Sequence, residues 1–165
     1  MKSEFKKVYD LIGETKTIML TTLNEDGALH SRPMNCQDMD EEGNLWFFTS
    51  SPTGKTADIE VNRQVNMAYA LPKDGSYVSI AGTAELVTDK EKIKELWKPI
   101  LKAWFPEGIE QPDLALLKVK MDSAEFWDEP KGKMVEMFKV VKAAISGEGY
   151  HNDASEHGRA NFNRN

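Results

Sequence analysis

The sequence is poor in cysteine and in long apolar runs. Cys36 is the single cysteine among 165 residues, so no intrachain disulfide can form, which fits a reducing compartment. No segment approaches the roughly 20 apolar residues that a membrane-spanning helix needs. The charged N-terminus also lacks the apolar stretch of a signal peptide. We therefore expect a soluble cytoplasmic protein with no membrane partner.

Positive charge and metal-binding patterns are scarce as well. Acidic residues outnumber basic residues by 27 to 21, which gives a formal net charge of −6. Proteins that bind nucleic acid regardless of sequence carry the opposite excess, because they displace phosphate counterions, so we expect no nucleic-acid partner. The histidines are His30, His151 and His157, and they lack the cysteine partners or helical spacing of zinc ligands. No metal site is predicted.

The remaining composition is that of one globular domain, with 40% hydrophobic and 29% charged residues. Apolar, β-branched segments separated by turn residues predict strands. These segments are 17–23, 28–36, 45–50, 65–71, 77–87, 114–121 and 124–127. Because mostly short turns join them, they predict a mainly β fold, an antiparallel barrel of six or seven strands with peripheral helices.

Apolar residues at helical spacing predict the peripheral helices. The predicted helices are 2–13, 89–104 and 133–146. A capping-box pattern at Thr88 and Glu91 should open the middle helix, and Pro99 should kink or divide it. The boundaries that we expect are 1–147 for the domain, 15–128 for its barrel core and 148–165 for a polar C-terminal tail.

Residues 51–56 (SPTGKT) end in Gly-Lys-Thr, as a phosphate-binding P-loop does. Thr49 stands where such a loop has its first glycine, which excludes that kind of nucleoside-triphosphate site. A strand end followed by a helix start still gathers hydroxyl groups, free backbone N–H groups and the Lys55 ammonium, which suits one phosphate. An ordinary capped helix start with an exposed lysine is the competing interpretation.

Arg32 stands beside Pro33 in a predicted strand. A guanidinium is costly to bury without an anion, and proline removes a backbone donor, so this strand needs a free edge or a bulge. Arg32 and Lys55 together would hold a dianionic phosphate well. A surface arginine in a loosely paired strand is the alternative. Cys36 has no neighbouring base in the sequence and is expected to act as a small hydrophobic residue.

Five motifs, in a fixed order, carry a resemblance to a known family. They are H-S-R-P-M (30–34), G-N-L-W-F-F-T-S (43–50), K-T (55–56), Y-V-S-I-A-G-T-A-E (77–85) and A-E-F-W-D (124–128). Their order resembles that of the FMN-binding split-barrel family typified by pyridoxamine 5′-phosphate oxidase, and most closely its general stress protein 26 branch. The resemblance implies that residues 1–147 form an FMN-binding split β-barrel. It also implies a homodimer with two FMN molecules at the subunit interface.

Carried over position by position, the resemblance implies a set of cofactor-binding residues. They are Arg32, Pro33, Met34, Phe48, Thr49, Ser50, Lys55, Thr56, Tyr77 and Trp127. In this set, the segment 32–34 lies along the flavin and its phosphate tail, Lys55 binds the phosphate, and Ser50 and Thr56 are hydroxyl donors nearby. Tyr77 reaches the flavin from the second subunit, and Trp127 packs beside the ring. No residue stands out as catalytic.

Two departures argue against pyridoxamine 5′-phosphate oxidase activity itself. Gly54 stands before the phosphate lysine, where the oxidase has a basic residue, and Asp128 and Glu129 replace a segment bearing arginine and histidine. We therefore expect a stress-related FMN-dependent oxidoreductase, with an unknown small-molecule substrate and an electron donor such as NAD(P)H. A non-catalytic flavin-binding stress protein, a deazaflavin-binding reductase and a cofactor-free interaction domain are the alternatives.

Overall fold

The structure is a computed structural model that describes residue 12 and residues 17–71, 75–128 and 156–161. Ile12 is helical and buried. The rest of the predicted helix 2–13 and the whole predicted helix 133–146 lie outside the described residues, as does most of the predicted tail.

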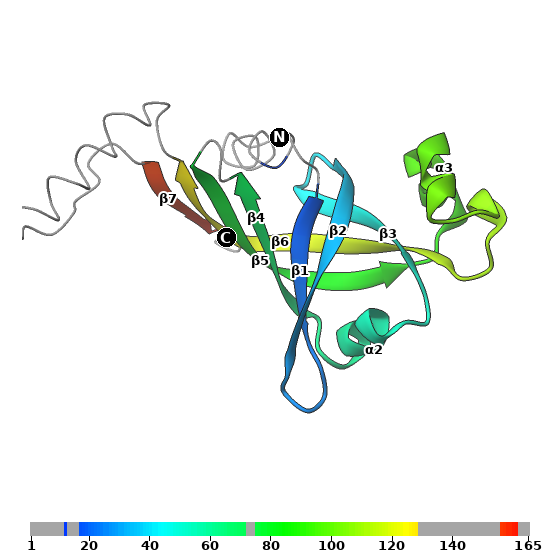
Figure 1. Cartoon of the computed structure of the whole chain (residues 1–165), viewed down its shortest axis with the longest axis horizontal. Helices are drawn as coiled ribbons and strands as arrows, with labels where there is room; N and C mark the ends of the chain where they lie inside the picture. The colour runs from blue at the N-terminus through cyan, green and yellow to red at the C-terminus, as the bar shows by residue number, and fades with distance from the viewer. Residues whose placement is uncertain (1–11, 13–16, 72–74, 129–155, 162–165) are drawn as a thin grey trace, which may run out of the picture.

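The described part of the chain forms one antiparallel sheet (Figure 1). Its strands are β1 (Thr17–Leu23), β2 (Leu29–Met39), β3 (Asn44–Ser50), β4 (Gln64–Leu71), β5 (Ser76–Val87), β6 (Leu114–Asp128) and β7 (Glu156–Asn161). The strand order is β3-β2-β1-β4-β5-β6-β7, and an additional pairing of β3 with β6 closes the first six strands into a barrel. This architecture confirms the predicted mainly β split barrel of six or seven antiparallel strands.

Strand β6 is longer than the sequence indicated. One strand of 15 residues replaces the two predicted at 114–121 and 124–127. Its first part pairs with β3, and its second part, from Ser123 to Asp128, pairs with β7. The predicted tail 148–165 therefore contains a strand. The polar composition of this segment did not predict a strand. Backbone hydrogen bonds hold an edge strand, and they leave no apolar pattern in the sequence.

Gly82 lies where the register between β5 and β6 shifts, between Ala81 and Gly82. A Cβ atom at Gly82 would come within 2.6 Å of the Lys120 carbonyl oxygen and 2.9 Å of Val119 Cγ1. Both the bulge and the close backbone approach that this glycine suggests are present, since only a residue without a side chain fits there.

The helices are short and lie at the periphery of the barrel. They are α2 (Gly54–Val61), α3 (Lys90–Leu96), and the 3₁₀ helices η1 (Pro99–Ala103) and η2 (Gly108–Glu110). The predicted helix 89–104 is thus divided, and η1 begins at Pro99, whose ring cannot continue an α-helix. The predicted capping residue Thr88 is wrong by one position, because the Asp89 side chain accepts the hydrogen bond from the Lys92 N–H at 2.8 Å.

Two apolar clusters share β3, whose successive side chains point to opposite faces. Leu45 and Phe47 belong to the cluster that fills the barrel, whereas Trp46 and Phe48 belong to a second cluster with side chains of α3 and η1. Burial on both faces explains why this segment is continuously apolar. Cys36 is buried in the barrel cluster, as expected for a small hydrophobic residue.

Candidate functional site

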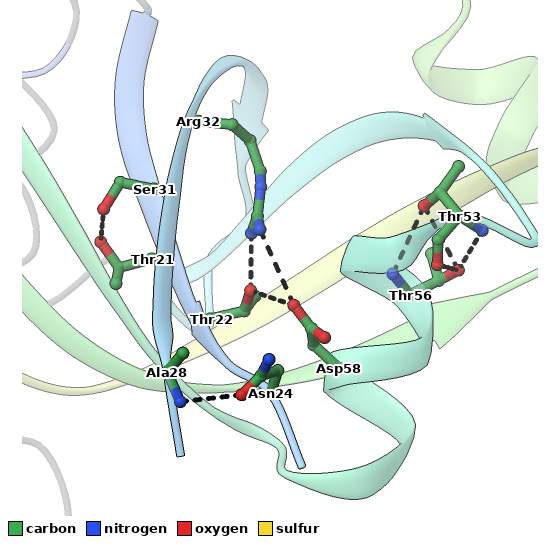
Figure 2. Close-up of polar contacts among 9 residues, drawn as sticks. All are labelled: Thr21, Thr22, Asn24, Ala28, Ser31, Arg32, Thr53, Thr56 and Asp58. Carbon is green, nitrogen blue, oxygen red and sulfur yellow. Dashed lines mark hydrogen bonds and ion pairs between the residues drawn. The ribbon is translucent and has the colours of Figure 1, made fainter. Parts of the chain in front are cut away.

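Arg32 lies in a polar cluster made by β1, β2 and α2. It follows the alternation of the buried residues Met34 and Cys36 on β2, so its side chain faces inward. Its Nη1 donates to Thr22 Oγ1 at 2.7 Å, and its Nη2 lies 3.7 Å from Asp58 Oδ2. Thr22 Oγ1 in turn donates to Asp58 Oδ2 at 2.7 Å, which closes a triangle of contacts (Figure 2). The alternative of a surface arginine in a loosely paired strand therefore does not fit Arg32, whose side chain is partly buried and paired.

Lys55 lies in the first turn of α2 and is half-buried. Its Nζ donates to the hydroxyl of Thr49 at the end of β3. Burial, and after it the positive charge of Arg32, lower the pKa of the Lys55 ammonium. Among the described residues, no carboxylate forms an ion pair with Lys55. The two predicted cations thus lie within electrostatic range of each other.

This arrangement fits a phosphate. A partly desolvated ammonium beside a second cation is unfavourable, and a bound anion would relieve both the desolvation and the repulsion. The first turn of α2 contains no acidic residue, so the positive end of the helix dipole is not neutralised there. The donor set is an ammonium and a guanidinium, which are groups that bind phosphate oxygens.

Thr56 belongs to the cap of α2. The Thr53 N–H donates to Thr56 Oγ1 at 2.8 Å, and Thr56 Oγ1 donates to the Thr53 carbonyl oxygen at 2.9 Å (Figure 2). Its hydroxyl proton is therefore used within the helix start, which argues against the implied role of Thr56 as a hydroxyl donor to a phosphate. The competing interpretation of an ordinary capped helix start is therefore correct for Thr56. The exposed lysine that this interpretation expected is not found, because Lys55 is half-buried.

Ser50 ends β3 next to Thr49. Hydrogen bonds from Gln111 and then from Ser50 lower the pKa of the Asp113 carboxyl. The Ser50 hydroxyl thus contacts the loop before β6 rather than the cation pair.

Three of the predicted cofactor residues line one cavity of about 320 Å³. Its lining residues are Thr17, Pro33, Met34, Asn35, Gln37, Phe48, Leu101, Trp104 and Phe105. Phe48 is fixed by an edge-on contact with Trp97, with ring centroids 5.6 Å apart. None of the described lining residues is charged, and an aromatic wall with a few amide groups suits a neutral planar ring. Since Arg32 precedes Pro33 and Thr49 follows Phe48, β2 and β3 connect this cavity to the cation pair.

Tyr77 and Trp127 lie elsewhere on the chain. They face each other across β5 and β6 and line a separate cavity of about 430 Å³, together with Met19 and other residues of β1 and β4. Both rings are partly exposed, at 43% for Tyr77 and 37% for Trp127. Thr17 lines both cavities, so they adjoin at the start of β1, but Tyr77 and Trp127 are not among the described residues that line the cavity of Pro33 and Phe48.

The sequence interpretation missed Thr22 and Asp58. Thr22 is completely buried and continues the inward alternation of Ile18 and Leu20 on β1, so a polar residue at that position was a usable signal. Asp58 follows Lys55 by three residues, which places both on one side of a helix. That spacing could have identified a carboxylate near the phosphate lysine.

In the part of the chain that the structure describes, no helix is long and apolar enough to cross a membrane. Within the same residues, no group of three or more histidine, cysteine, aspartate or glutamate side chains could hold a metal ion.

Comparison with known proteins gives a consistent set of matches. The family model described as "Pyridoxamine 5′-phosphate oxidase like" matches residues 3–151. Protein bli-3 of Neurospora crassa is 30% identical over 155 residues, which cover 86% of this chain and 74% of that protein.

Solved structures of general stress proteins share the fold. The general stress FMN/FAD binding protein of Xanthomonas citri is 32% identical, with a TM-score of 0.68 over 80% of this chain and 93% of that chain. General stress protein 26 of Bacillus anthracis is 26% identical, with a TM-score of 0.65 over 74% of this chain and 92% of that chain.

Proposed function

Because the chain belongs to the pyridoxamine 5′-phosphate oxidase-like family, in its general stress protein 26 branch, we propose that it is an FMN-binding flavoprotein. The observation that carries this proposal is the half-buried Lys55 ammonium beside Arg32, with no ion-pair partner for Lys55 among the described residues. A relative described as an FMN/FAD binding protein, that of Xanthomonas citri, supports the same ligand class.

The phosphate of the flavin would lie between Arg32 and Lys55. A terminal phosphate carries nearly two negative charges, which a planar guanidinium and an ammonium match better than either does alone. The hydroxyl of Thr49 accepts from Lys55 and donates to the Ser50 carbonyl oxygen at 3.2 Å, so it holds the ammonium in place. This match to a terminal phosphate is the reason for proposing FMN rather than a flavin without one.

The ring of the flavin would occupy the cavity lined by Pro33, Met34 and Phe48. When bound, FMN supplies hydride or electron transfer, while the protein supplies orientation and excludes water. No acid or base is among the described residues that line the cavity. The side chains therefore position the ring and its reaction partner without proton transfer of their own. We propose an FMN-dependent oxidoreductase that takes electrons from a reduced nicotinamide.

The proposed assembly is a homodimer. Met19, Tyr77 and Trp127 are large, more than one-third exposed, and line one cavity on the outer face of β1, β4, β5 and β6. A partner protomer would cover these side chains and gain the free energy of apolar burial. In such a dimer Tyr77 and Trp127 would reach the ring held by the other protomer, which accounts for their separation from that cavity within one chain.

Titration of the flavin-free protein with FMN tests the binding proposal. We expect saturable binding of one FMN per chain, with a dissociation constant below roughly 10 μM, or about −7 kcal/mol. Light scattering on the same sample should give the mass of a dimer. The absence of saturable FMN binding would overturn the proposal.

A non-catalytic flavin-binding stress protein is the second candidate, favoured by the absence of an acid or base among the described cavity residues. Anaerobic mixing of the FMN-loaded protein with NADPH, and separately with NADH, distinguishes the two. Loss of the oxidised-flavin absorbance supports the oxidoreductase. An unchanged spectrum with both donors contradicts it and leaves FMN binding intact.

A further inference from the structure

Asp58 is a carboxylate next to the proposed phosphate site. Its Oδ2 lies 3.7 Å from Arg32 Nη2 and accepts a hydrogen bond from Thr22 Oγ1 at 2.7 Å (Figure 2). Its side chain is only 13% exposed, and that of Arg32 is 23% exposed. Charges at this depth are screened less by salt than fully exposed charges, so their mutual effects are larger.

Helix α2 carries this carboxylate three positions after the phosphate lysine. Asp58 follows Lys55 by three residues, so the two side chains project from neighbouring positions on one helical face. The buried hydroxyl of Thr22 bridges Arg32 and Asp58, accepting from one and donating to the other. Arg32 is thus already bound to protein groups before any ligand arrives.

A carboxylate there works against the binding of a phosphate. It repels a dianion, and it competes with the phosphate oxygens for the Arg32 guanidinium. With Asp58 ionised, Arg32, Lys55 and Asp58 carry a net charge of one positive unit instead of two. The contacts with Arg32 and Thr22 hold the Asp58 carboxylate at this position, so its presence lowers the affinity of the site for a phosphate in addition to any effect on stability.

We propose that Asp58 is a specificity-determining residue that limits how strongly the site favours a phosphorylated flavin over an unphosphorylated one. It positions Arg32 in the absence of ligand, and it reduces the affinity for the phosphate once the ligand binds. The inference rests on the proposed FMN site. The Asp58 carboxylate makes the cofactor easier to exchange than in a site formed by Arg32 and Lys55 alone.

The test is the ratio of the dissociation constants of riboflavin and FMN, measured by calorimetry at low and at physiological salt. In Asp58→Asn, which keeps the oxygen that accepts from Thr22, we expect this ratio to rise about tenfold, as is typical for removing one unit charge near a dianion at a partly buried site. The rise should be larger at low salt. A ratio that is unchanged or lower would overturn the inference. If Asp58 served only to position Arg32, its replacement by asparagine would leave Arg32 less well positioned and would not strengthen the binding of the phosphate.

Glu60→Gln is the matched control. Glu60 lies on the same helix but is exposed, and the substitution changes the net charge by the same amount. We expect its ratio to stay within about twofold of the wild-type value, because exposed charges act weakly at a distance. An equal rise in both variants would also overturn the inference, since the effect would then come from net charge alone.

Two further variants keep the test decisive. Asp58→Glu retains the charge and should keep the ratio near that of the wild type. If Asp58→Asn does not fold, Asp58→Ser must raise the ratio, because it removes the same negative charge and leaves a smaller polar side chain. The same experiment distinguishes failure of the FMN proposal from failure of this inference. If the FMN proposal is wrong, the wild type binds FMN no better than riboflavin. If the wild type prefers FMN and Asp58→Asn leaves that preference unchanged, only the role of Asp58 is contradicted.

Discussion

Arg32 and Lys55 carry the same charge, but the protein treats them differently. Arg32 contacts Thr22 and Asp58, whereas the contact found for Lys55 in the described ranges is the hydroxyl of Thr49. A bound anion therefore gives Lys55 a charged partner, whereas Arg32 exchanges its contact with Asp58 for a contact with the anion. For this reason Lys55 is expected to contribute more to phosphate binding than Arg32, even though arginine is the better phosphate ligand in isolation.

Cys36 provides a pH prediction at the scale of one residue. Burial raises the pKa of its thiol from 9.0 to about 12. Between these two values the unfolded chain loses the proton while the folded chain keeps it, so ionisation favours the unfolded state and stability falls as the pH rises. Urea unfolding should show that, above pH 9, the free energy of unfolding of the wild type falls relative to that of Cys36→Ala. A difference that does not change with pH would contradict the proposed burial of the thiol.

At the scale of elements, short segments position the site. The start of α2 places Lys55, and Ile59 and Thr56 are the residues of α2 that are buried, which attaches the helix to the barrel. The inward alternation of β1 and β2 places Thr22 and Arg32 together. The extra residue of the bulge opposite Gly82 is Asp122, which lies between the part of β6 that pairs with β3 and the part that pairs with β7.

The bulge predicts the effect of a single methyl group. Gly82→Ala should lower the free energy of unfolding by about 2 kcal/mol or more, because overpacking a closely packed site is costly and backbone atoms cannot easily move. The methyl group would meet the Lys120 carbonyl oxygen at 2.6 Å. Chemical denaturation measures the loss.

Gly54→Ala is the control for this measurement, since nothing lies within 4 Å of a Cβ atom at that position. It should leave the stability unchanged or raise it by about 0.4–1 kcal/mol through the unfolded state. Equal effects of the two substitutions would show that the close approach at Gly82 is absent.

Gly54 also offers a gain-of-affinity prediction for the start of α2. Gly54→Arg adds a cation next to Lys55, at a position with open space around it. We expect FMN to bind more tightly by about 1 kcal/mol, a modest value because the added charge would be exposed. Riboflavin should bind as it does to the wild type. If Gly54→Arg and Gly54→Ala bind FMN equally well, the phosphate does not lie at this helix end.

At the scale of the whole molecule, the barrel presents two parts of the proposed site on different surfaces. The cation pair is Arg32 and Lys55, one cavity is lined by Phe48, and a second cavity is lined by Tyr77 and Trp127. We propose that two chains complete one site from these parts. Completion of the site would then give a reason for dimerisation that is independent of stability.

Mixed dimers test this arrangement. In a heterodimer of a Tyr77→Ala chain with a Lys55→Ala chain, one site keeps both side chains and the other loses both. We expect one FMN of wild-type affinity per dimer, counted by titration of heterodimers purified through two different affinity tags. Two sites of reduced affinity, one without Tyr77 and the other without Lys55, would mean that Tyr77 acts within its own chain.

The sequence predicted the barrel because alternating apolar strands and glycine turns are local signals. It also indicated Arg32 and Lys55, since cations are conspicuous in a strand and at a helix start, and their role in binding a phosphate stays a prediction. It did not predict β7, which backbone pairing holds, or Asp58, whose partner lies 26 positions earlier in the sequence, at Arg32. Asp89 was missed in favour of Thr88 because both are good capping residues and only the helix geometry decides between them.

The central claim, that Lys55 binds the phosphate of a flavin, is tested most directly by calorimetric titration of the wild type and Lys55→Ala with FMN and with riboflavin. Lys55→Ala should weaken FMN binding by about 1–3 kcal/mol, the size of a charge-assisted hydrogen bond, and leave riboflavin binding unchanged. Lys94→Ala, which removes the same charge from an exposed position on α3, should alter neither. Equal losses for both flavins, or no loss for FMN, would contradict the claim.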